Sequence, residues 1–96
     1  MGLELVVERA VPLSFPSLLE RLAALGLAAS IVMVDGALAA PGANPPNEWR
    51  DVRLRTRAGT VTLARRPGGV AVLVFGNADA ALQQAQRAIA DALAAG

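Results

Sequence analysis

Residues 51–76 constrain the fold of this 96-residue chain more than any other stretch, because they predict three consecutive strands. In the first of these, Val52, Leu54 and Thr56 alternate with charged side chains, so one face is apolar and the other is charged. Tight turns rich in glycine separate the runs. The predicted strands are Asp51–Arg57, Thr60–Arg66 and Val70–Phe75, and the turns are Ala58-Gly59 and Pro67-Gly68-Gly69.

The length of each turn sets the register of the hairpin it joins. A two-residue loop at Ala58-Gly59 would place Leu54 opposite Leu63, so the apolar side chains of both strands share one face. The turn around Pro67 leaves two registers open. A two-residue loop brings the valines of the last strand to that face, and a three-residue loop brings Leu73 and Phe75 there.

The rest of the chain predicts two helices and three further strands. Ser14 can cap the first helix and Gly26 can end it, because glycine readily adopts the left-handed conformation of a helix stop. Asp35-Gly36 predicts a hairpin turn. The expected elements are a strand at Leu3–Val7, a helix from Phe15 to Leu25, strands at Ser30–Val34 and Ala37–Ala40, a proline-rich loop at Pro41–Glu48, and a helix capped by Asn77 or Asp79 that ends at Ala95.

Together these elements predict a single α+β domain over residues 1–96. Its antiparallel sheet would have five to six strands, with both helices packed on one face. We expect the core to come from apolar residues at helical or strand spacing on those elements. The predicted core residues are Leu18, Leu22, Leu25, Ile31, Met33, Leu54, Leu63, Ile89 and Leu93.

The side-chain inventory limits the chemistry of the protein. The chain has no His, Cys, Tyr or Lys, and its nine basic residues are all Arg. This excludes thiolate and imidazole metal sites, Ser-His and Cys-His nucleophiles and Schiff-base lysines. We therefore predict no catalytic residues, no metal and no cofactor, and a non-enzymatic interaction domain. An enzyme that relies on carboxylates, with or without a metal, is the competing class.

The charged face of the strand Asp51–Arg57 is the main candidate site. Its arginines indicate an anionic partner, which is either an acidic protein surface or a nucleic acid. A net charge of +1 is far from the basic balance of a nucleic-acid binder. A solvated edge strand protected by its charges explains the same pattern without any partner. Trp49 is either a partner contact or a cover for the core. The predicted partner-binding residues are Trp49, Arg53, Arg55, Arg57 and Arg66.

The order of these elements resembles the roadblock/dynein light chain family. The similarity lies in a helix, a strand, Asp35-Gly36, a return strand, three meandering strands and an alanine-rich helix. Family members carry a helix between the second and third of these strands, where this chain has the loop 41–48. The resemblance implies a cytoplasmic scaffold or regulator of a small Ras-like GTPase.

We also expect the protein to form a homodimer. Two surfaces are open for this contact. One is the strand Asp51–Arg57 as an edge of the sheet, and the other is the sheet face without helices, where Val32 and Val34 would lie. No apolar run approaches the ~18 residues of a membrane span, and the acidic start is unlike a secretory signal. We therefore expect a cytoplasmic protein with no membrane partner.

Overall fold

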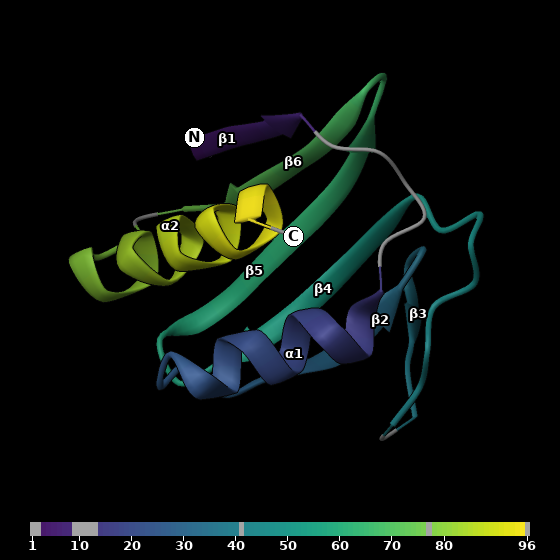
Figure 1. Ribbon diagram of the computed structural model, residues 1–96, viewed down its shortest axis with the longest axis horizontal. Coiled ribbons are helices and arrows are strands. Elements are labelled where there is room, and N and C mark those ends of the chain that lie inside the picture. Colours follow the sequence, from purple (N-terminus) through teal and green to yellow (C-terminus); the bar gives the residue numbers. More distant parts are fainter. Residues whose placement is uncertain (1–2, 9–13, 41, 77, 96) are drawn as a thin grey trace.

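The computed structural model describes residues 3–8, 14–40, 42–76 and 78–95, which form an α+β fold with one antiparallel sheet and two helices. This sheet has six strands in the order β1-β6-β5-β4-β2-β3. Both helices lie in front of it (Figure 1). The predicted fold class is confirmed. The elements are β1 (Leu3–Glu8), α1 (Phe15–Ala24), β2 (Ala29–Val34), β3 (Ala37–Leu38), β4 (Asp51–Thr56), β5 (Gly59–Arg66), β6 (Gly69–Val74) and α2 (Ala80–Ala95).

The meander β4–β5–β6 forms the middle of the sheet and has the predicted faces. Its apolar side chains point toward the helices and belong to one buried cluster. Arg66 pairs with Gly69, so Pro67 and Gly68 form a two-residue turn. Of the two registers that the sequence left open, the structure therefore has the one in which the valines lie on the covered face. The buried side chains of the meander on this face are Val52, Leu54, Val61, Leu63, Val70, Val72 and Val74.

The predicted register of the β4–β5 hairpin is wrong by two residues. Leu54 lies opposite Val61 and not Leu63, and the turn is formed by Arg57 and Ala58. The hydroxyl of Thr56 fixes this turn, because its Oγ1 accepts a hydrogen bond from the Ala58 N–H and donates one to the Gly59 carbonyl. A shift of two residues leaves every side chain on its predicted face, since the side-chain period of a strand is two.

Helix α1 begins and ends as its sequence predicts. The Ser14 hydroxyl accepts a hydrogen bond from the Ser17 N–H at the start. At the end, Gly26 has a φ of 83° and Leu27 donates a backbone hydrogen bond to Leu22. The left-handed turn at Gly26 directs Leu27 onto the core. Leu25 is left 64% exposed, so the prediction that Leu25 is a core residue is wrong.

Strand β2 contains a bulge that the sequence did not reveal. Its register against β4 shifts between Ile31 and Met33, so both Ile31 and Val34 face the helices while Met33 faces the opposite side. The predicted burial of Met33 and the placement of Val34 on the open side are therefore wrong. Ile31 packs against the core but is only half-buried.

Strand β4 lies between β5 and β2, so it is an interior strand. The prediction of a free edge at Asp51–Arg57, and of a dimer formed through it, is wrong. The interpretation of its arginines as charges that protect an edge is wrong for the same reason. The outer strands are β1 and β3.

Helix α2 completes the core. Asp79 caps it, because its carboxylate accepts a hydrogen bond from the Leu82 N–H. Asn77, the other predicted cap, lies outside the described residues. The apolar stripe of α2 packs on the core, with Leu82 half-buried at its start. The core residues predicted from the sequence and found buried are Leu18, Leu22, Leu54, Leu63, Ile89 and Leu93.

Candidate functional site

The candidate site is the face of the sheet opposite the helices, which we call the open face. Directly opposite residues in a sheet share a face, so the register identifies its side chains. One row crosses all six strands, and a second row beside it crosses four. The first row contains Glu4, Leu73, Thr62, Arg53, Met33 and Leu38, and the second contains Val6, Ala71, Ala64 and Asp51.

The open face combines buried small residues with exposed larger ones. Ala71 and Thr62 are buried beneath their neighbours. Leu38 is 87% exposed and Val6 57% exposed. Phe75, which directly follows β6, is 60% exposed. Exposed apolar side chains of this size, gathered on a face that none of the described helices covers, are typical of an interaction surface.

Arg53 and Arg55 place two positive charges on the open face. Both side chains are exposed, and each lies opposite a threonine of β5. Nη1 of Arg53 lies 3.6 Å from the sulfur of Met33. Within the described part of the chain, no carboxylate forms an ion pair with either arginine. Both guanidinium groups can therefore bind an anionic group of a partner.

The other two predicted site arginines differ from this pair, Arg57 in its position and Arg66 in having an ion-pair partner on the open face. Arg57 is exposed in the β4–β5 turn, where it lines a cavity of about 240 Å³ near the end of α1 and the start of α2. Arg66 reaches across β6 to form an ion pair with Glu4, with an N–O distance of 3.2 Å. The predicted row of Arg53, Arg55 and Arg57 therefore ends at Arg55, because Arg57 lies in the turn. Among the described residues, Arg53 and Arg55 are the open-face arginines of strand β4 that have no ion pair.

Trp49 is a core residue and not part of the exposed site. Its side chain is 1% exposed and packs edge-on against Phe15, with ring centroids 5.4 Å apart. The guanidinium carbon of Arg65 lies 4.8 Å from the centroid of the Trp49 ring, and Nη2 of Arg65 donates to the Asn47 carbonyl. The cation–π contact covers the remaining ring surface. The prediction of Trp49 as a partner contact is corrected, and its interpretation as a cover for the core holds.

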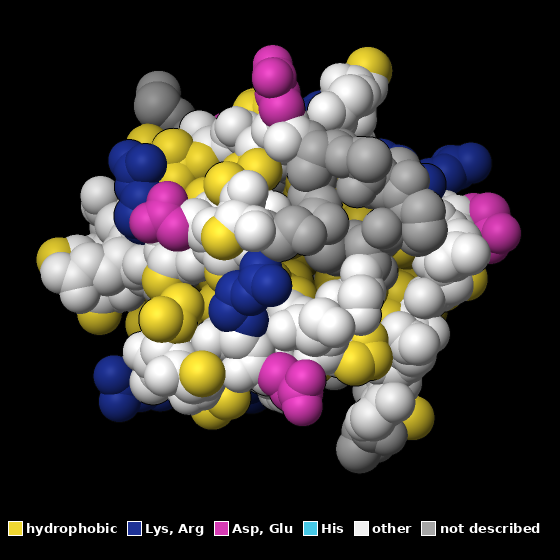
Figure 2. All heavy atoms as spheres, viewed as in Figure 1, with side chains coloured by type: hydrophobic (Ala, Val, Ile, Leu, Met, Phe, Trp, Pro, Cys, Tyr) yellow, Lys and Arg dark blue, Asp and Glu magenta, His cyan; other side chains and the backbone are white. Residues whose placement is uncertain are grey.

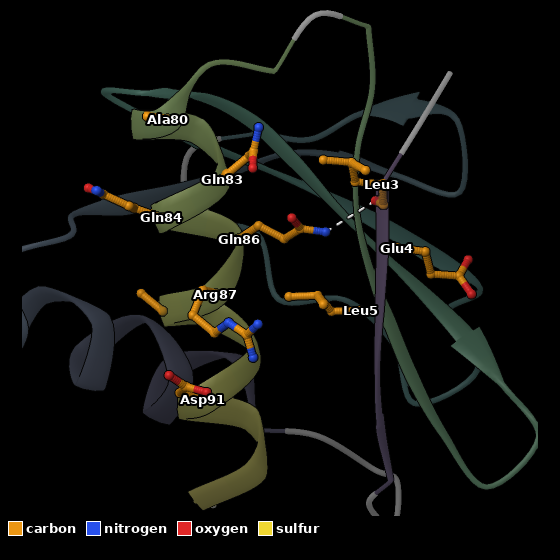
Figure 3. A pocket seen from close by; sticks show the side chains of 10 residues that line it. Leu3, Glu4, Leu5, Ala80, Gln83, Gln84, Gln86, Arg87 and Asp91 are labelled. Atoms are coloured by element: carbon orange, nitrogen blue, oxygen red, sulfur yellow. Dashed lines mark hydrogen bonds between the residues drawn. The ribbon is translucent and has the colours of Figure 1, made fainter.

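The helix side of the molecule has a different character. Arginines and carboxylates are scattered singly among hydrophobic side chains there, with no large area of one sign (Figure 2). A groove of about 650 Å³ runs between β1 and α2 (Figure 3). Leu3 and Leu5 line it from the strand, and Gln83, Arg87 and Asp91 line it from the helix.

The groove contains one buried polar residue, Gln86, which is 4% exposed. Its Nε2 donates to the carbonyl of Leu3 at 3.1 Å and to that of Val72 at 2.9 Å. Figure 3 shows the side chain pointing from α2 toward Leu3. This amide ties the helix to the outer strand and to its neighbour β6.

Two features of the structure were not predicted from the sequence: the burial of Gln86 and the contact of Arg65 with Trp49. Gln86 lies between Leu82 and Ile89 at helical spacing, so its place on the apolar stripe is a signal that it is buried. Arg65 alternates with Ala64 and so shares the face of Leu63. The Arg65–Trp49 stack itself requires the loop geometry, which the sequence does not show.

The described residues hold no group of three or more acidic, His or Cys side chains placed to bind a metal ion. The described hydroxyls of Ser14 and Thr56 are engaged in local hydrogen bonds at a helix cap and a turn. Neither of these hydroxyls has a general base beside it in those contacts.

Comparison with models of protein families, with curated proteins and with solved structures found no match. The roadblock resemblance therefore stays a prediction. The structure has β1 before the first helix and no helix within residues 42–50. Across the described residues, neither helix is both long enough and apolar enough to cross a membrane.

Proposed function

We propose that this protein is a non-enzymatic interaction domain that holds an acidic surface of another protein against its open face. The observation that carries the proposal is the pair Arg53 and Arg55, exposed and without an ion pair within the described residues, on a face that also exposes Leu38 and Phe75. Arginine next to exposed apolar side chains is the combination enriched in protein interfaces.

The size of the face fits a small interface. Six strands about 4.8 Å apart and about 3.3 Å per residue give a surface roughly 24 Å by 20 Å, or about 500 Å² in projection. Stable interfaces bury about 800 Å² of accessible surface on each partner. Side-chain relief makes the accessible area larger than the projection, so the face suits a contact at the lower end of the standard range.

The roadblock resemblance makes a small Ras-like GTPase the specific partner to test, and the proposal places the protein in the cytoplasm. Charged groups on such a face contribute to specificity and to the rate of association more than to affinity. We therefore expect binding that weakens as salt is raised, because exposed charges are screened.

Affinity purification with two matched charge reversals tests the proposal. Arg53→Glu and Arg57→Glu change the net charge equally, but only Arg53 lies on the open face. A partner that is retained by the wild-type protein and by Arg57→Glu, and lost with Arg53→Glu, supports the proposal. Equal retention by both variants contradicts it.

Two further measurements separate the competing classes. Binding of single-stranded RNA that weakens steeply with salt would favour the nucleic-acid alternative, in which Arg53, Arg55 and Arg57 contact phosphates. Stoichiometric binding of Mg²⁺ or Mn²⁺ at micromolar concentration, measured by isothermal titration, would favour a carboxylate enzyme. The proposal predicts neither result.

A further inference from the structure

The two outer strands of the sheet differ in length, and therefore in the number of backbone groups that can pair with another strand. β1 pairs with β6 along six residues without a break, and its other side faces no described strand. β3 has only two residues. A regular edge strand presents unpaired backbone groups that can pair with another chain. Leu3 of β1 is 45% exposed and Val6 57% exposed. Within Leu3–Glu8, the charges of Glu4 and Glu8 are the features that oppose pairing of this edge with another strand.

The groove between β1 and α2 extends along the whole of this edge strand. The 650 Å³ section lies beside Leu3–Leu5, and a second section of about 370 Å³ lies beside Leu5–Glu8. Three residues line both sections: Leu5, Arg87 and Asp91. In Figure 3, Arg87 extends from α2 toward Leu5, and Asp91 follows one turn later on the helix. Leu5, Arg87 and Asp91 therefore mark the middle of the groove.

We propose that two copies of this chain pair antiparallel through β1, with a two-fold axis at Leu5, so that their sheets become one. The partner is a second copy because β1 is complementary to itself in one of the two registers that pair five of its residues. With Leu5 opposite Leu5 of the second copy, Leu3 lies opposite Val7 and Glu4 opposite Val6. Apolar side chains then fill the two grooves, and no carboxylate faces another.

The neighbouring registers on the same face bring like charges together. With Val6 at the axis, Glu4 of each copy lies opposite Glu8 of the second copy. With Glu4 at the axis, the two Glu4 side chains face each other. Like charges directly opposite in a sheet are destabilising. Two registers pair five residues of β1, those centred on Leu5 and on Val6, and the charges of β1 favour the one centred on Leu5.

The two-fold axis at Leu5 also makes the two α2 helices antiparallel. Arg87 and Asp91 line the groove beside Leu5, so they border the β1 contact in each copy. This contact is isologous and closes at two copies. The short strand β3 at the far edge offers no comparable surface for continuing the sheet.

Single cysteines test the register, because the chain contains no cysteine of its own. In the proposed dimer the Cα atoms of the two Leu5 residues are about 4.5–5.5 Å apart. This lies within the range of a disulfide, about 4.4–6.8 Å. The two Val6 residues are offset by two positions and lie about 8 Å apart. Under mild oxidation we expect Leu5→Cys to form a linked dimer more than about tenfold faster than Val6→Cys. The reverse order overturns the proposal.

Sedimentation equilibrium tests the dimer without cross-linking and remains informative if Leu5→Cys does not fold. The wild-type protein should sediment as two copies of the 9.8 kDa chain at micromolar concentration. Val6→Glu places a carboxylate opposite Glu4 at two symmetric positions and should raise the Kd about 2- to 30-fold. Val6→Lys should leave the Kd unchanged or lower it. Each variant is first checked for an unchanged urea midpoint.

Leu38→Glu is the matched control, because Leu38 is exposed on the same face at the opposite edge. It should not change the Kd. Any of three results overturns the proposal. The first is a wild-type protein that sediments only as a single 9.8 kDa species. The other two are a dimer Kd that both Val6 variants raise, and a Kd that Leu38→Glu raises and Val6→Glu does not. This inference does not depend on the proposed function, since Arg53→Glu should leave the dimer intact.

Discussion

The two faces of one sheet differ in burial and charge, although the same strands supply both. On β4, Val52 and Leu54 are buried beneath the helices, whereas Arg53 and Arg55 between them are exposed. The covered face is a single apolar cluster that joins the sheet to both helices. Buried apolar and exposed charged side chains therefore alternate with a period of two along the chain, and the proposed function assigns binding to the exposed set. A substitution on one face should therefore change either stability or binding and leave the other.

The largest expected effect is on Trp49, at the end of the covered face. Trp49→Ala removes the contact with Phe15 and leaves the Arg65 guanidinium without its ring. We expect a loss of about 3–5 kcal/mol in the free energy of unfolding. Urea denaturation measures this loss. A loss of only a few tenths of a kcal/mol would mean that Trp49 is a surface residue, as in the partner-contact interpretation.

The comparison of faces is sharpest for two neighbours on β4. Leu54→Ala should cost about 2–5 kcal/mol of unfolding free energy, because Leu54 is fully buried in the cluster. Arg53→Ala should change it by no more than about 0.5 kcal/mol, since the side chain is exposed. Similar urea midpoints for the two variants would contradict the face assignment.

A smaller effect is expected at Gln86, the polar exception on the helix side of the sheet. Gln86→Ala removes the donor of a buried hydrogen bond to the Val72 carbonyl and of a partly buried one to the Leu3 carbonyl. We expect a loss of about 1–3 kcal/mol. Gln83→Ala is the control, because its amide also donates to a backbone carbonyl but is exposed. If both variants lose the same free energy of unfolding, the burial of Gln86 does not add to the stability of the fold.

The alternation of side chains made it possible to predict which face of the sheet each residue lies on. The register of the strands was harder to predict, because it depends on hydrogen bonds within the turns. The face of Leu54 followed from a period of two, and the cap at Ser14 and the stop at Gly26 followed from residue type. The β4–β5 register could not be predicted, because the Thr56 hydroxyl stabilises a turn one residue before the one that the glycine indicated, and this changes the register by two residues. The order of the strands in the sheet was the hardest feature to predict, because no residue near β4 in the sequence indicates that β2 pairs with it.

The bulge in β2 explains why the candidate site could be predicted only in part. Without the shift between Ile31 and Met33, Val34 would lie on the open face. Its position toward the core and that of Met33 beside Arg53 depend on how β2 meets β4. Arg53 and Arg55 were identifiable because strand alternation alone places them. Trp49 and Arg57 were not, because a loop and a turn determine where they lie.

The smallest expected effect is at Asp35, which lies in the turn between β2 and β3. Its carboxylate accepts hydrogen bonds from the backbone at the start of β4. The Asp51 N–H donates to its carboxylate at 3.0 Å and the Arg50 N–H at 2.7 Å. These hydrogen bonds, from Asp51 and then from Arg50, lower the pKa of Asp35 below its ordinary value of 3.8. They favour the charged form, so the carboxylate stabilises the folded state above pH 3.8.

This contribution should be lost as the pH falls from 3.8 through the lower pKa of the folded protein. Asp35→Asn keeps a side-chain oxygen that can accept from the same N–H groups, and it also suits the positive φ of 51°, but it carries no charge. The unfolding free energy of the wild type minus that of Asp35→Asn should therefore decrease below pH 3.8 and stay constant above about pH 5. Urea denaturation at a series of pH values measures this difference. A difference that is flat through the acid range would show that the charge of Asp35 does not anchor β4.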